Sequence, residues 1–138
     1  MRHQKSGKKL NRNSAERKYL YKNLIQSLFL HERMRTTVAK AKAIRPVAEK
    51  LLTRARKHDL VAYRALQAYL PDRSVAQKVF REIAPRFVNR PGGYIRIIKL
   101  GLRPSDQTPM AIVELTEKAK KEKVTRKKEV KKPSPKKD

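Results

Sequence analysis

Leucines recur at every fourth position early in the chain. The set is Leu20, Leu24 and Leu28, with Ile25 and Phe29 beside them. Apolar residues at this spacing form one face of an α-helix. Asn13 followed by Glu16 resembles a helix N-cap with an acid at the third helical position. The pattern therefore predicts a first helix over residues 14–31 whose apolar face is buried in a core.

The next segment changes its period. Residues 33–38 (RMRTTV) alternate, with Met34, Thr36 and Val38 on one face, which predicts a short strand. Thr36 or Thr37 then caps a second helix that runs to about residue 57. Its buried face should consist of Ala43, Val47, Leu51 and Ala55, with Ile44 and Leu52 beside them. Pro46 lies inside this pattern and predicts a kinked or divided helix, because proline lacks a backbone donor.

Two aspartates begin further helices. Asp59 is expected to cap a third helix that Pro71 ends, and Asp72 a fourth that ends at Pro85. The residues expected inward are Ala62, Tyr63, Leu66 and Leu70 on the third helix, and Val75, Val79, Phe80 and Ile83 on the fourth. Three helices therefore separate the first strand from the rest of the chain.

The C-terminal third has the composition of a hairpin. Residues 86–93 (RFVNRPGG) predict a loop, and two β-rich runs follow at 94–100 and 109–115. The link over 101–108 contains Gly, Pro, Ser and Asp, which favours a long hairpin loop. The element order predicts an α+β fold, with a small mixed three-stranded sheet and the helices packed on one face.

Charge extends the picture beyond the fold. The 138 residues carry 37 Lys and Arg against 12 Asp and Glu, a formal net charge of +25. Residues 117–138 hold 11 of the bases and 4 of the acids, so most of the excess lies in the rest of the chain. We expect a basic extended arm over 1–13, an α+β RNA-binding domain over 14–116, and a basic, disordered extension over 117–138.

Several classes of protein are disfavoured. The chain has no Cys, which excludes disulfides and thiolate metal sites. No apolar run approaches the ~18 residues of a membrane span, and we expect no targeting segment. HExxH, GxSxG, GxxxxGK[ST] and GxGxxG are absent, and His3, His31 and His58 do not form a catalytic pattern. We therefore expect no catalytic residue, metal, cofactor, small-molecule substrate or membrane partner.

The chemistry favours binding to nucleic acid. The arm contains no acid, so it cannot order itself in water and needs a polyanion to neutralise it. Its bases are Arg2, His3, Lys5, Lys8, Lys9 and Arg12. A second set leads into the second helix without an acid among them: Arg33, Arg35, Thr36, Thr37, Lys40 and Lys42. RNA is favoured over DNA, because no helix-turn-helix, zinc-finger or basic-zipper pattern occurs.

Five blocks of sequence together resemble the bacterial large-subunit ribosomal protein seventeen family. They are MRHQKSGKKLNRNSAER, LFLHERMRTTVAKAKAIRPVAEKLL, EIAPRF, NRPGGYIRIIKLGLR and PMAIVEL, and they span about residues 1–115 in order. The resemblance implies a helix, a strand, three helices and a hairpin. It also implies that Gly92, Gly93, Tyr94 and Arg96 form a family motif. Arg17, Lys18, Arg90, Tyr94 and Arg96 lie in or beside the matching blocks, and we add them to the expected RNA contacts.

The resemblance also implies a role. Such a protein is a cytoplasmic, ribosome-bound structural constituent, with large-subunit rRNA and neighbouring large-subunit proteins as partners. It is not an enzyme, and it lies on the solvent side near the exit of the nascent-peptide tunnel. The alternatives are an architectural DNA-binding protein and an enzyme that processes or modifies rRNA. A comparison of affinities for duplex DNA and rRNA at matched salt distinguishes the DNA-binding alternative from a ribosomal protein. The missing cofactor motif disfavours the enzyme.

Overall fold

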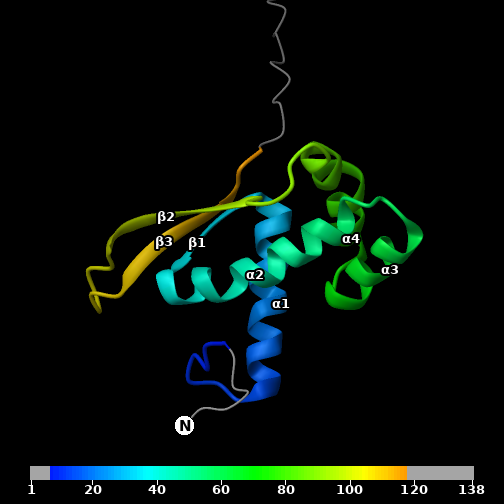
Figure 1. The fold of residues 1–138 in the computed structure, drawn as a ribbon. Coiled ribbons are helices and arrows are strands. Elements are labelled where there is room, and N and C mark those ends of the chain that lie inside the picture. The colour runs from blue at the N-terminus through cyan, green and yellow to red at the C-terminus, as the bar shows by residue number, and fades with distance from the viewer. Residues whose placement is uncertain (1–6, 118–138) are drawn as a thin grey trace, which may run out of the picture.

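The computed structural model describes residues 7–117, and it confirms the α+β class (Figure 1). Arg2, His3 and Lys5, and the extension beyond residue 117, lie outside the described residues. The elements are α1 (Ser14–His31), β1 (Arg33–Thr37), α2 (Val38–Ala55), α3 (Leu60–Tyr69), α4 (Arg73–Lys78), β2 (Ile95–Leu102) and β3 (Pro109–Leu115). A π-helical turn, Val79–Ile83, and a 3₁₀ turn, Ala84–Phe87, follow α4 directly.

The first helix has the predicted bounds and the predicted cap. The Asn13 side chain accepts a hydrogen bond from the Glu16 backbone amide at 2.8 Å, and the Glu16 carboxylate accepts one from the Asn13 amide at 3.4 Å. The helix ends at His31, and its C-cap is Glu32, whose φ of 58° is left-handed. Leu28 is buried as predicted, together with Ile25 and Phe29, whereas Leu20 and Leu24 of the predicted stripe are only half-buried.

The sheet has the strand order β1-β3-β2, and both pairs are antiparallel. The predicted mixed sheet is therefore wrong. β3 lies in the middle and runs opposite to both neighbours, so β1 and β2 share a direction without forming a parallel pair. The hairpin is confirmed, and an irregularity between Lys99 and Leu102 shifts its register. β1 ends one residue before the predicted bound, because Val38 begins α2.

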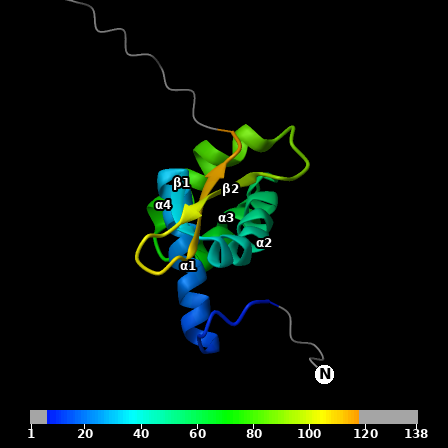
Figure 2. The same ribbon diagram turned by 90° about the vertical axis from the view of Figure 1, so that its left-hand side faces the viewer.

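Helix α2 lies against one face of the sheet and contacts all three strands (Figures 1 and 2). No helix of residues 7–117 covers the opposite face. The buried residues of α2 are Ala41, Ile44, Ala48, Leu51, Leu52 and Ala55. The prediction placed Ala43 and Val47 at the centre of this face, but both are half-buried. The face is wider and rotated because α2 also packs against α1 and α3.

Two prolines lie within the predicted helices, and their effects differ. Pro46 does not divide α2. Its ring is exposed, so water can reach the Lys42 carbonyl that loses its helical donor. Pro85 has a larger effect, because the expected fourth helix is regular only to Lys78 and continues as the π-helical and 3₁₀ turns. Phe87 therefore lies in a buried turn rather than in the predicted loop.

The turn between β2 and β3 is closed by its own side chains. Arg103 donates two hydrogen bonds to the Asp106 carboxylate, at 2.8 and 2.7 Å, and the Thr108 hydroxyl donates a third at 2.7 Å. The backbone also closes, since the Arg103 amide donates to the Thr108 carbonyl at 3.0 Å. These donors, the Arg103 side chain first, lower the pKa of Asp106 well below its ordinary value of 3.8.

The lowered pKa of Asp106 predicts that the turn loses stability in acid. A folded-state pKa below the unfolded one contributes stability that is present above about pH 4 and is lost as pH falls toward the folded value. We therefore expect the Asp106 carboxyl to titrate well below 3.8 when followed by NMR. In Arg103→Gln, which removes the first donor, its pKa should rise toward the ordinary value. An unchanged midpoint in that variant would contradict the assignment.

Candidate nucleic-acid interface

The uncovered face of the sheet brings arginines from two distant segments together. Strand register places Arg33 opposite Glu114 and Glu114 opposite Arg96, and the next row contains Arg35, Ile112 and Ile98. Directly opposite residues share a face of a sheet. We call these six residues the outer face. Met34, Ala111, Val113 and Ile97 alternate with them and point toward α2.

Charge on the outer face is positive. Arg33, Arg35 and Arg96 are exposed, whereas Glu114 is 6% exposed between two of them. Arg33 and Arg96 lie on the two edge strands, two strand spacings of about 4.7–4.9 Å apart, with Glu114 between them. Long arginine side chains can span that distance toward one extended ligand. Guanidinium forks bind phosphate oxygens with two parallel hydrogen bonds. The outer face therefore suits the backbone of a nucleic acid.

The start of α2 continues the basic surface. Thr37 caps the helix, with its hydroxyl accepting a hydrogen bond from the Lys40 amide at 3.4 Å. The first turn contains no acid. Lys42 is exposed and Lys40 is half-buried. Helix N-termini attract anions, so the two lysines and the helix dipole both favour binding of a phosphate here.

The described part of the arm turns back toward α1 instead of extending. Leu10 and Asn11 have positive φ angles of 53° and 50°, and the Tyr21 hydroxyl donates to the Lys8 carbonyl at 3.4 Å. An open hollow forms between the arm and the start of α1. Its lining is Lys9, Asn11, Arg12, Asn13, Ser14 and Arg17. The three described arm bases, Lys8, Lys9 and Arg12, are all exposed, and so is Lys18 on α1.

Two of the predicted RNA-contacting residues are buried in the fold, and a third is held by its own turn. Tyr94 is 1% exposed, packs its ring against Phe87 and donates its hydroxyl to the Pro91 carbonyl at 3.3 Å. Thr36 is buried on the inner side of β1. Arg90 is half-buried, donates to the Gly92 carbonyl at 3.2 Å and lies 3.7 Å from Glu117. Since neither Tyr94 nor Thr36 offers surface to a ligand, we remove both from the interface. The Arg90 side chain mainly stabilises the turn in which it lies.

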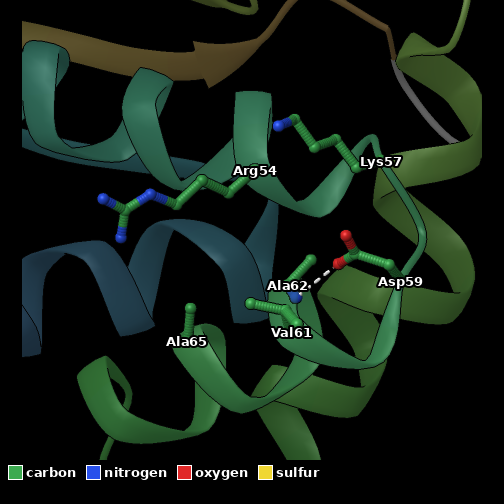
Figure 3. Close-up of a pocket in the computed structure, with 6 residues that line it drawn as sticks. All are labelled: Arg54, Lys57, Asp59, Val61, Ala62 and Ala65. Carbon is green, nitrogen blue, oxygen red and sulfur yellow. Dashed lines mark hydrogen bonds between the residues drawn. The ribbon is translucent and has the colours of Figure 1, made fainter.

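A smaller basic hollow lies between α2 and α3 (Figure 3). Arg54 and Lys57 border it on one side, and Val61 and Ala65 on the other. Asp59 caps α3 there by accepting from the Ala62 amide at 2.6 Å. The hollow has a volume of about 220 Å³. Small-molecule sites usually enclose roughly 300–1,000 Å³, so this hollow does not resemble one. Sequence analysis did not select Arg54 or Lys57, because single bases on helices carry no distinguishing pattern.

Acids within the described range mostly stabilise local structure. Asp59 and Asp72 cap helices as predicted, and Glu49 pairs with Arg45 at 3.1 Å. Glu32 pairs with Arg86 at 2.9 Å. Residues 7–117 contain no group of three His, Cys, Asp or Glu that could hold a metal ion. Within the same range, no helix combines the length and the apolar character that crossing a membrane requires.

Comparisons with known proteins match this chain along most of its length. The sequence profile described as ribosomal protein L17 matches residues 20–116. A protein named large ribosomal subunit protein bL17 from Thermodesulfovibrio yellowstonii is 48% identical over 95% of this chain and 98% of its own length. Proteins of the same name from Pelobacter propionicus and Geobacter sulfurreducens are 49% and 46% identical, over 85% and 93% of this chain. The alignments cover 92% and 73% of those two relatives.

Proposed function

The chain belongs to the ribosomal protein L17 family, and we propose that it binds large-subunit rRNA through the outer face, the start of α2 and the N-terminal arm. Membership makes it a structural protein of the large ribosomal subunit and not an enzyme. The alternative of an architectural DNA-binding protein is not favoured by that membership.

The observation that carries the proposal is the convergence of Arg33, Arg35 and Arg96 on one uncovered face. Phosphate contacts supply most of the affinity of such proteins, and arginine supplies many of those contacts. Exposed Lys42 and the arm bases extend the basic surface beyond the sheet. A folded RNA suits such separated patches, because its phosphates face a protein from several directions.

The location in the ribosome is a finer proposal. We place the protein on the solvent side of the large subunit, near the exit of the nascent-peptide tunnel, and in the bacterial cytoplasm. This placement is supported by the family resemblance. Neighbouring large-subunit proteins are then expected partners alongside rRNA.

A salt titration tests the proposed RNA binding. Each neutralised phosphate contributes about 0.7–0.9 to the fall of log K with log salt, so about 6–10 contacts make a doubling of salt cost tenfold or more. We expect this loss with purified large-subunit rRNA, measured by filter binding. A nearly flat titration would contradict the electrostatic account. Equal affinity for duplex DNA at matched salt would favour the alternative.

A further inference from the structure

The end of the β2–β3 hairpin projects past the start of α2, where Thr37 pairs with Met110. Figure 1 shows the turn beyond the N-terminal end of α2, away from the other helices. Residues 101–107 are all exposed. Leu102 is 61% exposed, and Ile98, which lies earlier in β2 and belongs to the outer face, is 38% exposed. A projecting turn with an uncovered leucine has apolar surface that no other described part of the chain buries.

The turn is nevertheless held in one geometry. The three side-chain hydrogen bonds on Asp106 join Arg103 to Thr108, and the Gln107 amide donates to the Arg103 carbonyl at 2.8 Å. Gln107 has a left-handed φ of 51°. A surface segment that is already ordered loses less conformational entropy when it binds a partner. This arrangement suits a docking element.

The turn also lacks the charge that characterises the rest of the protein. Residues 100–110 (LGLRPSDQTPM) contain one base and one acid, and these two are the bridged pair Arg103 and Asp106. The segment is thus electrically neutral within a chain of net charge +25. Neutral segments gain nothing from the counterion release that drives binding to RNA. Apolar area, in contrast, is favoured at the centre of protein interfaces.

We propose that the end of the hairpin, with Leu102 as its anchor, docks into an apolar recess of a neighbouring protein of the large subunit. The basic patches would then bind RNA while the neutral turn contacts protein. The inference rests on the proposed function, since it requires the chain to be seated in the subunit. RNA as the occupant of the turn is the competing outcome.

A matched pair of leucine substitutions tests the anchor. Leu102 and Leu60 are both 61% exposed, but Leu60 lies at the start of α3. Leu102→Ser should reduce retention in purified large subunits after a high-salt wash by at least about fivefold, which corresponds to roughly 1 kcal/mol. Its affinity for protein-free rRNA should stay within about twofold of wild type. Leu60→Ser should change neither quantity.

The possible outcomes distinguish a failure of the docking site from a failure of the proposed rRNA binding. Unchanged retention of Leu102→Ser would overturn the docking site, and so would an equal loss of rRNA affinity. Failure of the wild type to bind rRNA or enter subunits would instead contradict the proposed function.

A photo-crosslinker at position 102 gives an independent answer in assembled subunits. We expect an adduct that survives ribonuclease and contains a large-subunit protein identified by mass spectrometry, whereas an adduct with RNA alone would overturn the proposal. The same crosslinker at position 35 should yield RNA adducts.

Discussion

Leu28→Asp is expected to unfold the protein. Leu28 is fully buried on α1 and belongs to the main core cluster. Aspartate at this position removes apolar contacts and places a carboxylate where no base is introduced to pair with it. Such burial costs several kcal/mol, against a total stability of about 5–15 kcal/mol for a domain. We expect loss of the cooperative melting transition in circular dichroism.

Leu30→Asp is the control for this substitution. It makes the same chemical change on the same helix, but Leu30 is 44% exposed. The new charge stays hydrated, and its position near the C-terminus of α1 costs only about 0.3–1 kcal/mol. Melting curves in which both variants resemble wild type would show that α1 does not pack as described.

Arg33→Gln, Arg35→Gln and Arg96→Gln combined should abolish most of the specific affinity for rRNA. These side chains are the exposed bases of the outer face. If each contacts a phosphate, the triple variant loses about 2–3 from the salt slope. At about 0.1 M salt this corresponds to roughly a hundredfold loss of affinity. Filter binding to large-subunit rRNA over a range of salt measures both quantities.

A second triple variant controls for net charge. Arg64, Arg73 and Arg81 are exposed on α3, α4 and the π-helical turn. Changing these three to glutamine removes the same total charge, but it leaves the outer face intact. We expect a loss of less than about threefold. Equal losses in the two variants would mean that affinity follows total charge, and would refute a defined interface on the sheet.

Local structure could largely be predicted from local sequence. The Asn13 and Glu16 cap, the bounds of α1 and the helix starts at Asp59 and Asp72 are all confirmed. Each depends on residues within one or two turns of one another, so the interactions are readable without knowing the fold. The four-helix order and the hairpin follow from the same short-range signals.

Side-chain roles required the tertiary structure. The sequence pattern treated Tyr94 as a contact in a basic motif, but packing against Phe87 makes it part of the core. The buried face of α2 was misplaced because the sheet, α1 and α3 all pack against this helix and together decide which of its residues are covered. The irregular end of the fourth helix reflects Pro85 together with the packing of Ile83 and Phe87.

The sequence by itself determined the basic character of the protein, its class of fold and its resemblance to one family. Net charge and short-range periodicity are the same for every arrangement of the elements, so both can be read from the sequence alone. Only the tertiary structure decided that Arg33 and Arg96 share a face, because β3 lies between two strands that are distant in the chain and pairs Glu114 with both residues. Only the tertiary structure showed that Arg103 and Asp106 neutralise each other directly, because their bridge depends on how that turn closes.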